Sequence, residues 1–137
     1  MKRIFVDANI VIDLMCVRRP WFRDAQKLYS LAENGEISLY CSSLTLATAS
    51  YIMGTNKISN HDIVETMEHF CQICIPTRVD AEVVQKAIHS NFTDFEDAMQ
   101  YYSAKTVNAD LIITRNIKDF AEAEIPVMTA EAYLESL

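Results

Sequence analysis

The sequence predicts an α/β protein: a three-layer α/β/α sandwich with a central parallel sheet of four to five strands. Short apolar runs, such as 4–6 and 111–113, alternate with longer segments that are apolar at helical spacing. The runs lack polar alternation, which is typical of strands covered on both faces. Half of the 137 residues are hydrophobic, with two glycines and three prolines. We therefore expect one folded domain over residues 1–137 and exclude a disordered chain.

The expected elements follow from apolar spacing and from capping residues. Pro20 suits the first turn of a helix, Gly35 and Gly54 suit helix ends, and serines near 42 and 59 suit helix starts. The strands are expected at 3–6, 37–41, 71–75, 111–113 and 127–128. The helices are expected at 8–15, 21–34, 43–53, 60–70, 80–89, 94–107 and from 129 onward.

The charge balance limits the classes of function that the protein can have. Twelve basic against nineteen acidic residues give a net charge of −7, which provides no general attraction to phosphate backbones. This balance fits a protein without a nucleic-acid partner, or one whose acids hold cations. No apolar run has the length of a signal-peptide core or a membrane helix, so we expect a soluble, cytoplasmic protein. In that compartment the Cys71 and Cys74 pair is expected to be reduced and to alternate within a strand.

Polar residues follow the strands at the edge where parallel sheets place their sites. Asp7-Ala8-Asn9 follows the first strand, residues 42–45 the second and residues 114–119 the fourth, while residues 94–97 open a long helix. Carboxylates that converge there repel one another unless a cation intervenes. Mg²⁺ or Mn²⁺ prefers such oxygen ligands and can promote phosphodiester hydrolysis. The three histidines are scattered, which disfavours zinc.

Four segments in this order resemble the PIN-domain nuclease family, the fold of VapC-type toxins. They are FVDANIVID at 5–13, SSLT at 42–45, DFEDA at 94–98 and ADLIITRNIKDF at 109–120. The resemblance covers nearly the whole chain. It implies a Mg²⁺- or Mn²⁺-dependent endoribonuclease that hydrolyses RNA, is often a homodimer, and is often restrained by an antitoxin protein.

The resemblance also implies the site residues. The metal-holding, catalytic acids would be Asp7, Asp97 and Asp119, with Asp94 beside them. The supporting residues would be Asn9, Thr48, Thr114 and Asn116. Most active members carry a Glu about one turn into the third helix, where this chain has Thr48. Because a hydroxyl is a weaker and neutral ligand, this departure puts metal affinity or activity in question.

Each acid also has a structural interpretation. Asp7 and Asp94 could be plain helix caps, and Asp119 could cap a turn. On a helix, Asp94 and Asp97 lie about 60° apart, whereas Glu96 lies about 100° from Asp97 and is expected to be solvated or to serve in capping.

The remaining charges have weaker functional interpretations. Arg115 could bind a substrate phosphate or be a solvated loop charge. We expect Asp13, Asp110, Glu122 and Glu124 to be ordinary surface or loop charges. The basic and aromatic segment 18–21 could touch RNA or an antitoxin, although a loop leading into a helix explains it equally well.

Two other functions compete with catalysis by a metal nuclease. A PIN-like module that has lost catalysis could act by binding RNA or a partner protein, consistent with the missing helix Glu and the acidic balance. An enzyme that forms an aspartyl phosphate on Asp7 also begins with a strand that ends in Asp. There the residue two positions on is usually Asp, whereas this chain has Asn9.

Overall fold

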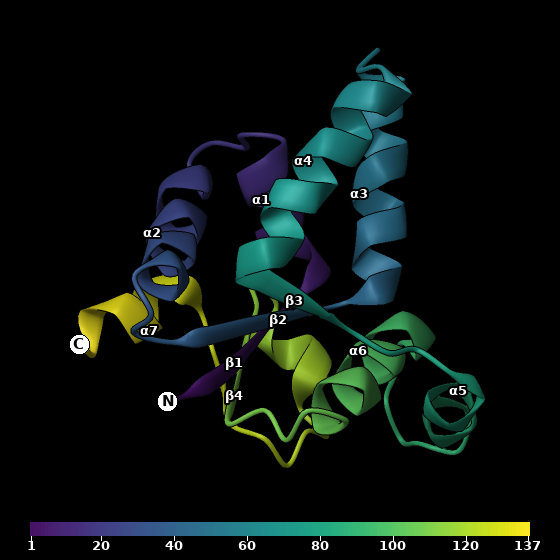
Figure 1. Cartoon of the computed structure of the whole chain (residues 1–137). Coiled ribbons are helices and arrows are strands. Elements are labelled where there is room, and N and C mark those ends of the chain that lie inside the picture. The colour runs from purple at the N-terminus through teal and green to yellow at the C-terminus, as the bar shows by residue number, and fades with distance from the viewer.

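Five parallel strands form the centre of the protein, in the order β3-β2-β1-β4-β5 (Figure 1). The structure is a computed structural model that describes residues 1–137. The strands are β1 (Arg3–Val6), β2 (Ser38–Ser42), β3 (Cys74–Thr77), β4 (Leu111–Ile113) and β5 (Val127–Met128). The predicted parallel sheet is therefore confirmed at five strands.

Seven α-helices and one 3₁₀ turn surround the sheet (Figure 1). The α-helices are α1 (Ala8–Met15), α2 (Phe22–Glu33), α3 (Ser43–Thr55), α4 (Asn60–Ile73), α5 (Ala81–Ile88), α6 (Phe95–Lys105) and α7 (Ala130–Glu135), and the 3₁₀ turn is η1 (Ile117–Phe120). None of these helices combines the length and the apolar character needed to cross a membrane.

The helices bury the sheet on both faces, which confirms the sandwich. On one face, residues of α1, α2, α4 and α7 pack against β1, β2 and β4 around Ile4, Val6 and Ile113. On the other face, α6 and η1 pack against Phe5 and Ile112 through Tyr101 and other apolar residues. The central strands β1 and β4 are apolar at every buried position because each face of the sheet has its own helical cover.

The register places the ends of β1 and β4 side by side. Val6 pairs with Ile113, so the next residues, Asp7 and Thr114, leave the sheet as neighbours. The Asp7 backbone N–H donates to the Ile113 carbonyl at 2.9 Å. This pairing brings residues 107 positions apart in the sequence into one site.

Two predicted element boundaries are wrong. Cys71 to Ile73 continue α4, and β3 begins only at Cys74, so the two cysteines do not alternate in one strand. The helical hydrogen bonds of α4 continue up to Cys74, where the chain begins to pair with β2 as strand β3. Gly54 lies inside α3 rather than ending it, and the left-handed residue after that helix is Lys57. Gly35, in contrast, has the expected left-handed φ of 76° after α2.

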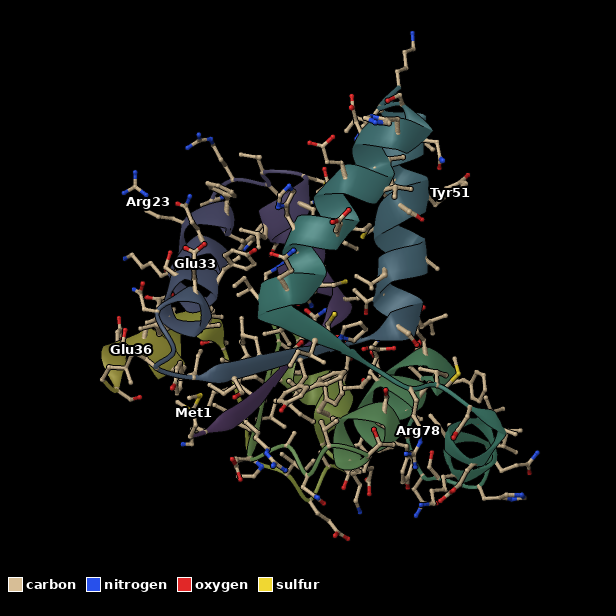
Figure 2. The ribbon with its side chains drawn as sticks, viewed as in Figure 1. Met1, Arg23, Glu33, Glu36, Tyr51 and Arg78 are labelled. Carbon is tan, nitrogen blue, oxygen red and sulfur yellow. The ribbon has the colours of Figure 1, made fainter.

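Helices α3 and α4 lie side by side and extend from the body of the molecule (Figure 1). The α3 sequence has no charged residue, yet only part of the helix is covered. Tyr51 on α3 is 73% exposed and points into solvent (Figure 2).

Candidate active site

Asp7 is the buried acid at the carboxyl end of the central strand. It is 6% exposed and is the N-cap residue of α1. One carboxylate oxygen accepts the Ala8 N–H at 2.8 Å, and the other accepts the Thr114 hydroxyl at 2.8 Å. The cap therefore exists, but a cap alone does not require burial or a partner from another strand.

The segment after β4 is tied to Asp7 by short polar contacts. Besides Asp7, the Thr114 hydroxyl contacts the Asn116 N–H, which donates to it at 3.0 Å. The Asn9 amide nitrogen lies 3.4 Å from both the Asp7 carboxylate and the Thr114 hydroxyl. Asn9, Thr114 and Asn116 therefore form a polar frame around Asp7, in the positions where the sequence placed supporting residues.

Helix α6 brings two more acids, Asp94 and Asp97, toward Asp7. The Asp94 side chain caps the helix by accepting the Asp97 N–H at 3.0 Å. Asp97 is half-buried, whereas Asp94 is exposed. The interpretation of Asp94 as a helix cap is therefore correct at the level of structure, and this cap also holds the first turn that carries Asp97.

The electrostatics identify these carboxyls as one cluster. Burial, followed by the charges of Asp7, Asp94 and Asp119, raises the pKa of Asp97 from 3.8 to about 7. Burial also raises the pKa of Asp7, against the lowering effect of its hydrogen bond from Thr114. Groups whose ionisation is disfavoured by burial and by like charges are typical of metal and catalytic sites.

The charge of Glu96 also acts on this cluster. Its charge raises the pKa of both Asp7 and Asp97, and at Asp7 its effect exceeds that of Asp119. The helical angle between the two residues predicts that the Glu96 side chain points away from that of Asp97, and Glu96 is exposed. However, all residues of a first helical turn lie near the helix end, so a long side chain there keeps its charge within range of the site. Asp119 is also exposed and lies in η1.

The acids offer oxygen ligands of the kind that Mg²⁺ or Mn²⁺ prefers. Asp7 and Asp97 fit such an ion best, because a cation would relieve the repulsion that raises the pKa of both groups. The Asp7, Asp97 and Asp119 carboxylates do not form a tight triad. Only one group of His, Asp and Glu residues has its ligand atoms within 4.8 Å of one another, and it lies on α4, fully exposed: His61, Asp62 and Glu65.

The third helix contributes hydroxyls but no acid. Thr48 is exposed, and its hydroxyl donates to the Leu44 carbonyl within α3 at 3.4 Å. One turn earlier, the buried Thr45 hydroxyl accepts a 3.2 Å hydrogen bond from the Gln100 amide of α6. The Gln100 amide oxygen is buried without a partner. Thr45 belongs to the segment 42–45 that follows the second strand, but nothing in the sequence pairs it with Gln100.

The expectation that Asp13 is an ordinary surface charge is wrong. Asp13 is 0% exposed, and both of its oxygens accept hydrogen bonds from Arg115, at 2.9 and 3.2 Å. The guanidinium of Arg115 also lies over the Trp21 ring, 3.9 Å from its centre. The Arg115 side chain therefore points to α1, where two of its N–H groups are bonded to Asp13, and it is half-buried rather than a solvated loop charge. Helical spacing could have found Asp13, since it continues a buried stripe with Ile10.

Asp97 predicts how the stability of the metal-free protein depends on pH. Its pKa of about 7 in the folded state lies above the unfolded value of 3.8. The folded protein therefore binds this proton more tightly, and stability at this site is lost as the pH rises from about 4 to about 7. After allowance for solvent screening, we expect Asp97→Asn to raise the free energy of unfolding at pH 8 by about 1–2 kcal/mol.

Urea unfolding in EDTA at pH 4 and pH 8 measures this effect. The gain from Asp97→Asn should be present at pH 8 and nearly absent at pH 4. A gain of equal size at both values, or no gain at pH 8, would contradict the assignment of the titrating group.

A family model described as PIN domain matches residues 3–118. The chain belongs to the PIN domain family. The resemblance stated from four sequence segments is thereby confirmed: the match contains the first three segments in full and the fourth as far as Lys118, so Asp119 lies just beyond it. Asp7, Asp97 and the Thr114–Asn116 segment are thus parts of a PIN domain.

Similar proteins extend the comparison over almost the whole chain. Ribonuclease VapC1 of Aquifex aeolicus (strain VF5) is 27% identical over 139 residues, which covers 98% of this chain and 94% of that protein. A toxin–antitoxin complex from Klebsiella pneumoniae contains a chain with a TM-score of 0.64 and 22% identity, covering 93% of this chain and 97% of that one. VapBC2 from Rickettsia felis, bound to a promoter DNA fragment, matches with a TM-score of 0.61 and 18% identity, covering 93% and 98%. These solved structures share the fold of this PIN domain.

Proposed function

We propose that this PIN domain is a ribonuclease that hydrolyses RNA phosphodiester bonds with a bound divalent cation, Mg²⁺ or Mn²⁺. The observation that carries the proposal is the cluster around buried Asp7 and half-buried Asp97, whose carboxyls both have a raised pKa. Similarity to a protein named ribonuclease VapC1 over nearly the full length supports RNA as the substrate.

The residues divide into ligands and a supporting frame. Asp7, Asp97 and Asp119 would hold the cation, with Asp94 keeping the first turn of α6 in place. Asn9, Thr114 and Asn116 keep the Asp7 carboxylate oriented through the contacts described above. When bound, the cation supplies charge neutralisation at a phosphate and activation of water for attack on phosphorus.

The direct test is cleavage of a panel of structured and unstructured RNAs by the purified protein. We expect cleavage with Mn²⁺ or Mg²⁺, its loss in EDTA, and its recovery on adding back the metal. Cleavage that is unaffected by EDTA would contradict the metal requirement. No cleavage across the panel, together with no calorimetric signal for Mn²⁺, would contradict the nuclease itself.

We also propose an antitoxin protein as a partner and a homodimer as the assembly. Support for the partner comes from the similar structures, which include the toxin–antitoxin complex from Klebsiella pneumoniae and the DNA-bound VapBC2 complex from Rickettsia felis. The net charge of −7 favours a partner with a basic segment over the acidic edge. Tyr51, which is 73% exposed on α3, suits contact with a second copy.

A second candidate function is a PIN module that binds RNA or a partner without cleaving. The favouring observation is Thr48, an exposed hydroxyl in the helix where most active members of the family carry Glu. Thr48 already donates within its own helix, so it adds no charge to the cluster.

Thr48→Glu tests how much Mn²⁺ affinity the protein loses by carrying Thr48 where most active members of the family carry Glu. If Thr48 stands in the place of the usual acid, an added carboxylate should increase Mn²⁺ affinity by about 10-fold, the lower end of what one partner near a metal contributes. Calorimetry in the absence of RNA measures this. Ala47→Glu, at the neighbouring exposed position about 100° around α3, is the matched control and should leave the affinity unchanged. Equal effects of the two variants would contradict the assignment.

A further inference from the structure

We propose that Asp13, Arg115 and Trp21 form a clamp that positions the segment after β4 over Asp7, so that Arg115 is a positioning residue rather than a contact to RNA. The inference rests on the proposed nuclease function for its catalytic consequence. The clamp itself is a structural device outside the acidic cluster, and it joins α1, the loop before α2 and the segment that carries Thr114 and Asn116.

The first observation is the geometry of the ion pair. Asp13 lies on α1 and is 0% exposed, while the Arg115 side chain is 26% exposed. Arg115 Nε donates to Asp13 Oδ2 at 2.9 Å and Nη2 donates to Oδ1 at 3.2 Å. Two parallel hydrogen bonds fix both the position and the plane of the guanidinium, which a single contact or a lysine ammonium would not.

The second observation is the aromatic cover. The guanidinium carbon lies 3.9 Å from the centre of the Trp21 ring. The same guanidinium that bonds Asp13 is therefore also covered by a residue that precedes α2. A cavity of about 280 Å³ borders this stack and is lined by Asp13, Trp21, Arg115 and Asn116 among others, so the side chain has room to leave if its partners are removed.

The third observation links the clamp to the site. Arg115 lies between Thr114, whose hydroxyl donates to Asp7 at 2.8 Å, and Asn116, whose N–H donates to Thr114 at 3.0 Å. The Arg115 N–H itself points to the Asn9 side-chain oxygen at 3.4 Å. A displacement of Arg115 therefore moves the groups that orient the Asp7 carboxylate.

Stability alone does not explain a buried ion pair at this place. Two apolar residues of similar volume often stabilise a protein as well as or better than a buried pair. A pair that is directional and bidentate is expected where orientation matters, because a misplacement of about 1 Å at a catalytic group can cost about 100-fold in rate.

The main experiment compares Arg115→Lys with the apolar double variant Asp13→Leu/Arg115→Met. Arg115→Lys keeps a charge for Asp13 and so retains the fold. The double variant fills the space of the ion pair with apolar side chains, which pack but make no directional hydrogen bonds. We expect both to lower kcat for RNA cleavage by at least about 10-fold, with KM for RNA unchanged within about two-fold and with melting temperatures close to that of the wild type. Arg23→Met, an exposed arginine on α2, is the control and should match the wild type (Figure 2).

Two outcomes overturn the proposal. Wild-type kcat in the folded double variant would mean that the clamp only fills space. A higher KM with unchanged kcat in Arg115→Lys would mean that Arg115 contacts the RNA.

Two readouts do not depend on cleavage and so separate the clamp from the nuclease function. Trp21 is the single tryptophan of the chain, so its acrylamide quenching reports on the guanidinium cover. Quenching should rise about two-fold in the double variant. Hydrogen exchange of the Arg115 and Asn116 amides should accelerate at least about 10-fold relative to those of β1. Unchanged quenching and exchange would overturn the clamp, whereas these changes in a protein that cleaves no RNA would overturn only the nuclease.

Discussion

Asp7→Asn is expected to lower RNA cleavage by at least about 100-fold while the protein stays folded. Even residues that only orient metal ligands typically contribute 10–100-fold, and Asp7 is proposed as a ligand itself. Its carboxyl is buried with a raised pKa, so the charge destabilises the metal-free fold. A neutral amide of the same shape should therefore maintain or raise the free energy of unfolding in EDTA at pH 8.

The control is Glu122→Gln, which removes an exposed carboxylate without changing the cluster. Cleavage rates at saturating Mn²⁺ and urea unfolding in EDTA are measured for both variants. Cleavage by Asp7→Asn at the rate of Glu122→Gln would contradict the proposed site. A large loss of stability in Asp7→Asn would instead indicate that Asp7 serves mainly as the helix cap.

Arg115→Met is expected to lower the free energy of unfolding by about 3–5 kcal/mol at pH 8. The substitution leaves the fully buried Asp13 carboxylate without its side-chain hydrogen-bond partner, with only the more distant charge of Arg18 remaining, and a buried charge without hydrogen bonds is costly. Burial already raises the pKa of Asp13, against the lowering effect of Arg115. Without Arg115 the folded-state pKa rises further, so the deficit should shrink at low pH, where Asp13 binds a proton in both states.

Urea unfolding at pH 4 and pH 8 measures this second effect. Adding Asp13→Leu to Arg115→Met should recover the stability to within about 1 kcal/mol of the wild type, because the buried charge is gone. A loss below about 1 kcal/mol in Arg115→Met at pH 8 would contradict a tight pair.

Local signals in the sequence predicted the helix caps and most of the sheet. Asp7, Ser42, Ser59, Asp80, Asp94 and Thr129 all cap helices through their side chains. Caps are readable because the donor and acceptor lie within three residues of each other. The boundary between α4 and β3 was misplaced, because an apolar segment such as 70–75 suits either a buried helix or a strand.

The positions of the strand-end acids followed from the order of the elements. A parallel sheet brings the carboxyl ends of its strands to one edge, so Asp7 and Thr114 had to be neighbours once β1 and β4 were adjacent. Glu96 is exposed, as its helical angle predicts, although its charge contributes to the raised pKa of Asp97. Asp13 was misjudged, because it is buried whereas single charges are usually exposed.

The sequence by itself determined the α/β class, the PIN resemblance and the acids at the strand ends, because these depend on periodicity and on residues adjacent in the chain. Only the tertiary structure decided which charges share an environment. Burial raises the pKa of Asp97 to about 7, and the Asp13–Arg115 pair spans 102 positions. Desolvation and pairing depend on which distant segments pack together, and no local pattern of residues records that.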